Sequence, residues 1–241
     1  MTPFRRRRLL LRIGIAAPIL ALVCTLIAVA LFPGFNHATQ FLSELGAGGA
    51  RHPQVFNAGV AFSGIGAGIA GIGFGLAVVA LGGSRIAAGL IALAFVLAAI
   101  GLVVGSIYVW PDPRHLFINL GLGIQLAPLF LLWGLRRAEG VDRLRWFLVV
   151  VFVLMAFLTV MTKHLVLPGT VNPQNVGWWE RAFAIVLVGW VGVAAFLLER
   201  RLIALVLESA ETVPDEATRL REEGALVTDT SQLRDDRPIT N

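Results

Sequence analysis

The sequence has few charged residues and a single cysteine. Charged side chains make up 15% of its 241 residues, whereas about 25% is usual in a soluble domain. This low charge argues against an ordinary soluble protein. Cys24 is the only cysteine, so the chain cannot form an internal disulfide. Val23 before it does not fit a lipoprotein signal, and we interpret Cys24 as a buried thiol within a helix.

Six apolar runs, almost free of charged residues, are each long enough to cross a bilayer. They are residues 13–32, 55–81, 86–109, 116–135, 146–162 and 182–199. Backbone groups in lipid must hydrogen-bond within the chain, and a barrel would need alternating strands, so we predict helices. The predicted fold is all-α: a six-transmembrane-helix bundle over residues 1–207. Residues 208–241 are predicted to be an acidic, disordered tail, with a short helix around 215–223 as an alternative.

Basic residues are distributed unevenly over the segments that flank these runs. Twelve share one side of the membrane: Arg5, Arg6, Arg7, Arg8, Arg12, Arg85, Arg136, Arg137, Arg143, Arg145, Arg200 and Arg201. The other side has four: Arg51, Arg114, Lys163 and Arg181. The positive-inside rule then predicts a plasma-membrane protein with both termini in the cytoplasm. These basic residues indicate topology and anionic lipid partners rather than nucleic acid.

A cleaved signal peptide is an alternative for the first run. Basic residues, an apolar segment and the sequence Ala28-Val29-Ala30 match its general pattern. The run is longer than a usual signal-peptide core, which favours a retained helix. Cleavage would leave five helices with the same outer segments.

No Asp, Glu, Lys, Arg or His lies near the centre of a predicted span. Ion-coupled transporters and proton relays usually place such groups there, so the sequence argues against a pump. Gln125 lies near the middle of the fourth run, where we expect it to hydrogen-bond a neighbouring helix. Pro128 is expected to kink that helix.

Glycine is frequent in the second run, which contains the GxxxG pairs Gly64/Gly68 and Gly71/Gly75. Small residues at this spacing let membrane helices approach closely. The pattern predicts tight packing within the chain and leaves a homodimer seam through this helix as an alternative.

Histidines and carboxylates mark the predicted outer side. All four histidines lie there: His37, His52, His115 and His164. The only outer carboxylates are Glu44, Asp112 and Glu180. Each outer segment therefore has a histidine and an acid, whereas the cytoplasmic connections contain mainly arginine. This asymmetry predicts that any functional site lies at the outer face.

The first outer segment reads FPGFNHATQFLSELGA at residues 32–47. Plotted as a helix over residues 37–45, it has one polar and one apolar face. His37, Gln40 and Glu44 share the polar stripe, and Asn36 is placed to cap the start. We predict a short amphipathic helix at the outer interface. Its polar stripe faces either a pocket between helix ends or water.

The second and third outer segments hold the other candidate residues. Asp112 before Pro113 is predicted to cap the fourth helix. His115 and Arg114 follow, close enough to Asp112 for it to orient the imidazole or for the group to clamp an anion. Glu180 is predicted in the first turn of the sixth helix, where the dipole favours a carboxylate. Arg181 follows it, and His164 is predicted to end the fifth helix.

Two short motifs resemble a known membrane family. Ser-Glu-Leu-Gly-Ala at residues 43–47 and Trp110-Pro111-Asp112 are similar to stretches of the bacterial and archaeal family catalogued as domain of unknown function 998. The cysteines common in that family at the second stretch are absent here. The resemblance covers roughly residues 13–200. It implies a six-helix membrane domain without implying a particular activity.

Three functions remain open from the sequence. The first is a binding site for a lipid headgroup or small amphiphile at the outer face. The second is an intramembrane hydrolase, with or without zinc, although no HExxH or GxSxG motif is present. The third is a structural or regulatory membrane protein without a ligand. The candidate site residues are His37, Gln40, Glu44, Asp112, His115, His164, Glu180 and Arg181; no metal or other cofactor is assigned.

Overall fold

The structure is a computed structural model that describes residues 2–109, 112–163, 167 and 169–235, with side chains described as far as residue 210. The described part of the chain is helical and contains no strand. Its helices are α1 (Pro3–Ala30), η1 (Leu42–Gly46), α2 (Pro53–Ala80), α3 (Arg85–Ile107), η2 (Pro113–Leu126), α4 (Ala127–Gly134), α5 (Asp142–Thr162) and α6 (Val176–Asp235). Both η1 and η2 are 3₁₀ helices. Residues Met1–Arg200 form one compact unit, and Arg201–Asn241 form a second.

Six helical segments are long and apolar enough to cross a membrane, which confirms the predicted architecture. The first begins at Pro3 rather than at residue 13. The Thr2 hydroxyl accepts a hydrogen bond from the backbone N–H of Arg5 at 3.3 Å, and Pro3 occupies the first turn. This is the usual chemistry of a helix start, and it places the N-terminal arginines inside α1.

The fourth span, Pro113–Gly134, changes its helix type along its length. The 3₁₀ helix η2 ends at Leu126, and α4 begins at Ala127. Pro128 has no backbone N–H, so the predicted irregularity at this proline coincides with the change of helix type. Near its start η2 lies very close to α3, because a Cβ atom at Gly101 would be 2.8 Å from the Phe117 carbonyl oxygen.

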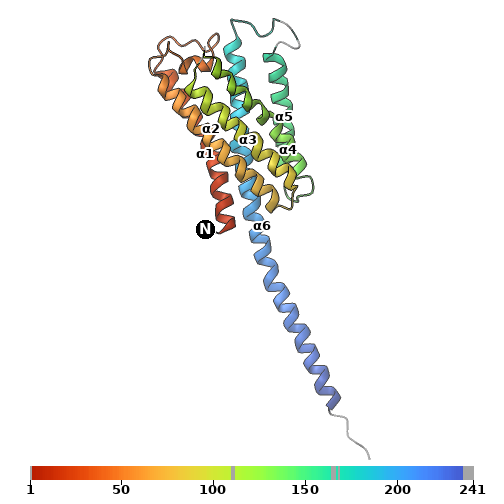
Figure 1. The fold of residues 1–241 in the computed structure, drawn as a ribbon. Helices are drawn as coiled ribbons and strands as arrows, with labels where there is room; N and C mark the ends of the chain where they lie inside the picture. The colour runs from red at the N-terminus through yellow and green to blue at the C-terminus, as the bar shows by residue number, and fades with distance from the viewer. Residues whose placement is uncertain (1, 110–111, 164–166, 168, 236–241) are drawn as a thin grey trace, which may run out of the picture. The chain divides into compact units, whose positions relative to one another are not determined.

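The helices α1, α2 and α3 lie side by side (Figure 1), and α2 uses glycine on two faces. Towards α1, a Cβ atom at Gly66 would lie 2.9 Å from the Ala17 Cβ. Towards α3, a Cβ atom at Gly68 would lie 2.8 Å from the Ala99 Cβ. The α2 glycines that pack on α3 are Gly64, Gly68, Gly71 and Gly75. The predicted GxxxG pairs therefore pack within the chain, and a homodimer through them stays a prediction.

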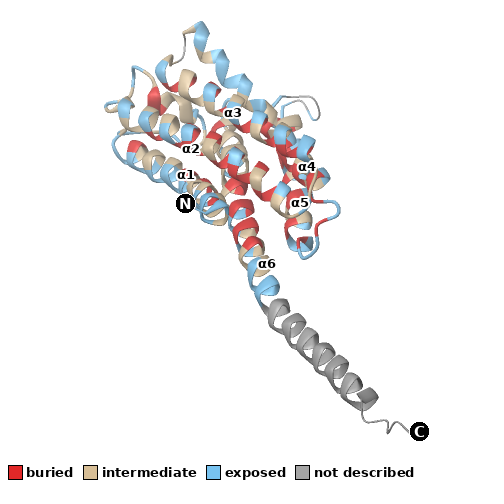
Figure 2. Ribbon diagram, turned by 60° about the horizontal axis from the view of Figure 1, so that its bottom comes forward, coloured by how far each residue is buried: buried red, intermediate tan, exposed pale blue. Residues whose placement is uncertain are grey.

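Aromatic rings join α6 to this group. Trp190 of α6 has its ring centroid 6.2 Å from that of Phe74 in α2 and 5.8 Å from that of Phe95 in α3. All three side chains are buried. Buried residues lie mainly on the faces that the helices turn towards one another, whereas the outward faces are exposed (Figure 2). Apolar outward faces are what a helix bundle presents to lipid.

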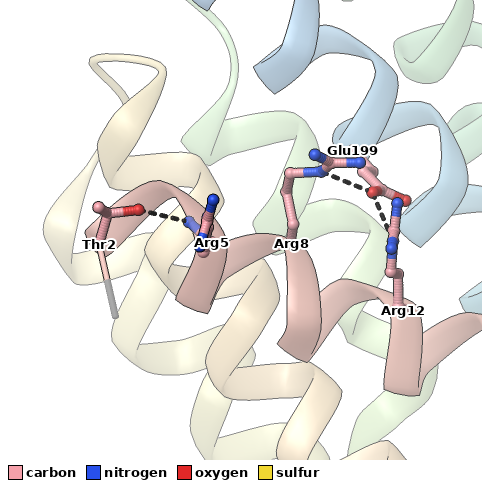
Figure 3. Close-up of polar contacts among 5 residues, drawn as sticks. All are labelled: Thr2, Arg5, Arg8, Arg12 and Glu199. Carbon is pink, nitrogen blue, oxygen red and sulfur yellow. Dashed lines mark hydrogen bonds and ion pairs between the residues drawn. The ribbon is translucent and has the colours of Figure 1, made fainter.

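The bundle has two chemically different ends. We call the end with residues 31–52, 108–109, 112 and the start of α6 the polar end. The opposite end, with the start of α1 and the connections 81–84 and 135–141, is the arginine end. There the Glu199 carboxylate accepts hydrogen bonds from the Nε atoms of Arg8 and Arg12, each at 2.8 Å (Figure 3). Glu199 is buried, so this ion pair fixes α1 against α6.

The helix α5 packs on α4 and η2. The Thr159 hydroxyl of α5 donates a hydrogen bond to the side-chain oxygen of Gln125 at 2.9 Å. This contact confirms that Gln125 hydrogen-bonds a neighbouring helix. Among the described side chains it provides a polar link within a largely apolar interface.

The backbone of α6 continues as helix to Asp235, where the sequence predicts an acidic tail from residue 208. Glutamate, alanine, arginine and leucine recur in this segment and are strong helix formers. The division between a membrane domain at 1–207 and a tail stays a prediction, as does the disorder of that tail.

Candidate functional site

The segment between α1 and α2, residues 31–52, is called here the first connection. Its own side chains bind its backbone, and the predicted helix over residues 37–45 is not formed. The Asn36 side chain accepts a hydrogen bond from the Ala38 N–H at 2.9 Å. The Gln40 side chain accepts one from the Asn36 N–H at 2.7 Å. Such local bonds compete with helical ones. The prediction was wrong in helix type and bounds, because only the short η1, Leu42–Gly46, is present.

Glu44 stabilises this connection internally. Its Oε1 accepts a hydrogen bond from the Phe41 N–H at 2.8 Å, and its Oε2 accepts one from the Gln40 side-chain amide at 2.8 Å. Gln40 and Glu44 are therefore neighbours, as the predicted stripe requires. Both carboxylate oxygens of Glu44 are already engaged, which gives this residue a structural role.

Arg181 of α6 binds the first connection through its guanidinium group. Its Nη1 donates to the Gln40 carbonyl oxygen at 3.0 Å, and its Nε donates to Nδ1 of His37 at 3.2 Å. The guanidinium also lies over the Phe35 ring, 5.2 Å from the centroid. The His37 ring stacks on Trp178 at 5.9 Å. His37 and Arg181 thus dock the first connection onto the start of α6.

Glu180 makes a second link between the same two segments. Its Oε2 accepts a hydrogen bond from the Leu42 N–H at 2.6 Å. The backbone N–H of Gly177 donates to the Ala38 carbonyl oxygen at 2.8 Å close by. Because α6 begins at Val176, Glu180 lies beyond the first turn. The predicted interaction with the helix start is replaced by this contact with η1.

Asp112 caps η2 as predicted. Its side chain accepts a hydrogen bond from the Arg114 N–H at 2.8 Å and pairs with Nη2 of Arg114 at 2.7 Å. The Arg114 side chain, and then its backbone N–H, lower the pKa of Asp112 to about 2. The Arg114 guanidinium also lies 3.7 Å from the centroid of the Tyr108 ring. Asp112 therefore binds Arg114 and does not orient His115.

His115 is oriented by the end of α3. Its Nδ1 lies 3.0 Å from the Gly105 carbonyl oxygen and 2.9 Å from that of Tyr108. Carbonyl oxygens only accept hydrogen bonds, so we assign the ring proton to Nδ1. In the neutral ring Nε2 is then a hydrogen-bond acceptor. The imidazole thus closes the end of α3 and keeps one nitrogen available.

His115 and Glu180 both line a cavity of about 350 Å³. Residues from α1, α2, α3, η1, η2 and α6 form its walls, which are mostly apolar. The polar side chains that line it are Ser43, Asn57, Ser63, Ser106, His115, Asn119 and Glu180. The cavity is therefore an opening among the transmembrane helices with several hydrogen-bonding groups in an apolar wall.

Along α6 the polar and apolar lining groups occupy different depths. On α6 the lining begins with Glu180 and continues through Phe183, Leu187 and Val191. At 1.5 Å per residue, Glu180 and Val191 are about 16 Å apart along the helix, roughly half of a 30 Å hydrocarbon core. Ser43 and His115 lie with Glu180 at the polar end. The cavity thus extends from the polar end, where we call it the mouth, towards the middle of the bundle.

Ser63 is the deepest polar residue on the α2 wall. Its side chain is buried, with 7% exposure, and its hydroxyl has no hydrogen-bond partner among the described residues. Nearer the mouth on the same helix, the Asn57 amide donates to the Gly46 carbonyl oxygen at 3.0 Å. Buried hydroxyls normally have a partner, so Ser63 presents an unused hydrogen-bonding group to the cavity.

The structure therefore divides the predicted site residues. Two of them, His115 and Glu180, line the cavity. Four others stabilise the first connection or bind it to α6: His37, Gln40, Glu44 and Arg181. Asp112 binds Arg114. His164 lies outside the described residues. In the part of the chain that the structure describes, no three His, Cys, Asp or Glu side chains group as metal ligands.

Sequence reasoning missed five polar residues of the cavity wall: Ser43, Asn57, Ser63, Ser106 and Asn119. A signal was present on α2, where Asn57, Val60, Ser63 and Ala67 recur at helical spacing and line the cavity together. Polar residues on one stripe of an apolar helix indicate that this stripe does not face lipid.

Six apolar membrane-length helical segments define a multi-pass helical membrane protein, and five of them line the largely apolar cavity. A sequence model of the family described as protein of unknown function DUF998 matches residues 15–197. The chain belongs to this family, as its motifs suggested. No curated protein and no solved structure matches the chain.

Proposed function

We propose that this protein binds a small single-chain amphiphile in the cavity, with the polar head at the mouth. The observation that carries the proposal is the order of lining groups, polar at Glu180 and His115 and apolar from Phe183 to Val191. This order matches an amphiphile that enters from one leaflet. A purely structural void would gain nothing from polar groups in its wall.

The cavity volume supports a small ligand. About 350 Å³ is near the lower limit of ligand pockets, which span roughly 300–1,000 Å³. A diacyl phospholipid would not be enclosed in this space. One hydrocarbon chain with a compact head suits both the volume and the depth of about half a bilayer.

We further propose that the polar end faces the extracytoplasmic side of the plasma membrane and that both termini are cytoplasmic. The excess of arginine at the opposite end supports this orientation. Those arginines are then placed to contact anionic lipid. An impermeant maleimide that labels His37→Cys in a Cys24→Ala background in intact cells would support the orientation; labelling only after lysis would contradict it.

A structural role without a ligand is the second candidate, because Gln40, Glu44 and Asp112 are fully explained by contacts within the fold. It does not explain the unpartnered Ser63 hydroxyl. For the hydrolase alternative we find no supporting contact. Ser106 lines the cavity, but its hydroxyl donates to the Val103 carbonyl oxygen at 2.7 Å.

Native mass spectrometry can test the proposal with an equimolar mixture of dodecyl amphiphiles that have cationic, neutral and anionic heads. Ala184→Phe would fill the cavity, since Ala184 lines it. Ala182→Phe is the matched control, because Ala182 is exposed on the same helix. We expect a saturable one-to-one complex with the unchanged protein and the control, and its loss in Ala184→Phe.

Two results would overturn the proposal. One is the absence of any saturable complex with the unchanged protein. The other is a folded Ala184→Phe protein that binds as well as the Ala182→Phe control.

A further inference from the structure

The proposed function does not specify the ligand's head group. The side chains at the cavity mouth indicate which chemical groups that head can carry. We infer that the head group donates hydrogen bonds and carries no negative charge. The inference rests on the proposed function and concerns the three side chains His115, Glu180 and Ser63.

Glu180 presents an unused acceptor to the cavity. Its Oε2 accepts from the Leu42 N–H at 2.6 Å, and the structure gives Oε1 no hydrogen bond among the described residues. The side chain is only partly exposed. A carboxylate oxygen in this position accepts a hydrogen bond from an ammonium or hydroxyl group, and such charge-assisted bonds are the strong ones.

His115 presents a second acceptor. Because Nδ1 is directed at the Gly105 and Tyr108 carbonyl oxygens, the neutral ring offers the lone pair of Nε2. Two acceptors at one mouth suit a head with at least one N–H or O–H donor. Ser63 lies deeper and can pair with a polar atom below the head.

No described arginine or lysine lines the cavity. The arginines beside His115 and Glu180 in the sequence bind other groups: Arg114 pairs with Asp112, and Arg181 donates from Nε and Nη1 to the first connection and to Gly177. Its Nη2 is buried without a partner but does not line the cavity. A carboxylate or phosphate head would therefore face the Glu180 carboxylate with no basic side chain among the described groups that line the cavity, which costs binding energy.

The test measures dissociation constants in phosphatidylcholine nanodiscs for four dodecyl probes: dodecylamine, dodecanol, dodecyltrimethylammonium and laurate. We expect dodecylamine and dodecanol to bind at least about tenfold more tightly than laurate or dodecyltrimethylammonium. The trimethylammonium probe is cationic but has no N–H donor, so it separates charge from hydrogen bonding.

Glu180→Gln removes the charge and retains an oxygen that can accept from Leu42. It should weaken dodecylamine binding about tenfold and leave dodecanol nearly unchanged. Asp142→Asn is the control for the same loss of a carboxylate, because Asp142 pairs with Arg145 at the arginine end. Thermal unfolding checks that both variants are folded.

The outcomes separate the two proposals. Laurate or dodecyltrimethylammonium binding as tightly as dodecylamine would overturn the head-group inference and leave amphiphile binding intact. Unchanged dodecylamine affinity in folded Glu180→Gln would also overturn it. If none of the four probes binds saturably, the proposed function itself fails.

Discussion

Glu44 and Glu180, two carboxylates of the polar end, differ in what their oxygens contact. Both oxygens of Glu44 accept hydrogen bonds from its own connection, whereas Glu180 uses one oxygen on Leu42 and lines the cavity. A sequence cannot distinguish them, because each is an acid beside an apolar segment. The distinction depends on which backbone N–H groups come within reach after folding.

Ser63→Ala should separate stability from binding. The hydroxyl has no partner within the described chain, so its removal should leave the free energy of unfolding unchanged or raise it by up to about 1 kcal/mol. Affinity for a dodecylamine that carries a hydroxyl group on its chain should fall severalfold, whereas affinity for dodecylamine itself, which has no polar atom below its head, should stay unchanged. Thermal unfolding without ligand and with each of the two probes measures both effects.

Thr159→Val is the comparison for Ser63→Ala, since Thr159 donates to Gln125. It should lower stability by roughly 0.5–1 kcal/mol and leave amphiphile affinity unchanged. A Ser63→Ala protein that loses as much stability as Thr159→Val would show that the Ser63 hydroxyl has a structural partner.

Glu199→Gln should destabilise the contact between α1 and α6. Glu199 is buried and binds two arginines, but Arg12 is 60% exposed. We therefore expect a loss of about 1–3 kcal/mol, less than the 3–5 kcal/mol typical of a fully buried pair. Asp142→Asn, with a 76% exposed carboxylate, should cost no more than about 0.5 kcal/mol. Equal losses in the two variants, measured by chemical unfolding, would argue against this account.

At the scale of elements, α2 is the helix around which α1 and α3 pack, and its glycines permit both contacts. Gly71→Ala would place a Cβ against the Phe95 side chain, whereas a Cβ at Gly89 meets nothing within 4 Å. We expect Gly71→Ala to lower the unfolding free energy by about 1–3 kcal/mol. Gly89→Ala should be neutral or slightly stabilising. Thermal unfolding that showed no difference would contradict the packing described for this helix.

The first connection depends on α6 for its position. Arg181→Gln removes the donors that bind the Gln40 carbonyl and His37. Amide hydrogen exchange in residues 36–46 should then become severalfold faster. Arg114→Gln is the control, because Arg114 binds Asp112 within its own connection. Unchanged exchange after Arg181→Gln would mean that the connection is held by its internal bonds alone.

Element prediction succeeded where hydropathy decides the outcome and failed in the first connection, where several side chains bind the backbone. All six spans follow from apolar runs. The helix over 37–45 was not formed, because Asn36, Gln40 and Glu44 capture N–H groups of their own connection. The cap at Asp112 was predictable, since it involves only the two following residues.

At the scale of the whole compact unit, sequence predicted which end carries the polar groups but not the cavity. His115 and Glu180 were selected because outer segments concentrate histidines and acids. Ser63 was not, because its role depends on the walls that α1, η2 and α6 add around α2. A cavity is the space that remains between several packed elements, so no single segment of the sequence specifies it.

The central claim is that an amphiphile occupies this cavity, and photo-crosslinking with a diazirine-bearing dodecylamine tests it most directly. Leu187 lines the cavity, whereas Ile185 is 68% exposed on the outer side of α6. We predict a crosslink at Leu187 that excess unlabelled dodecylamine abolishes, and labelling of Ile185 that the competitor does not change. Labelling confined to Ile185, or labelling of Leu187 that does not respond to the competitor, would contradict the account.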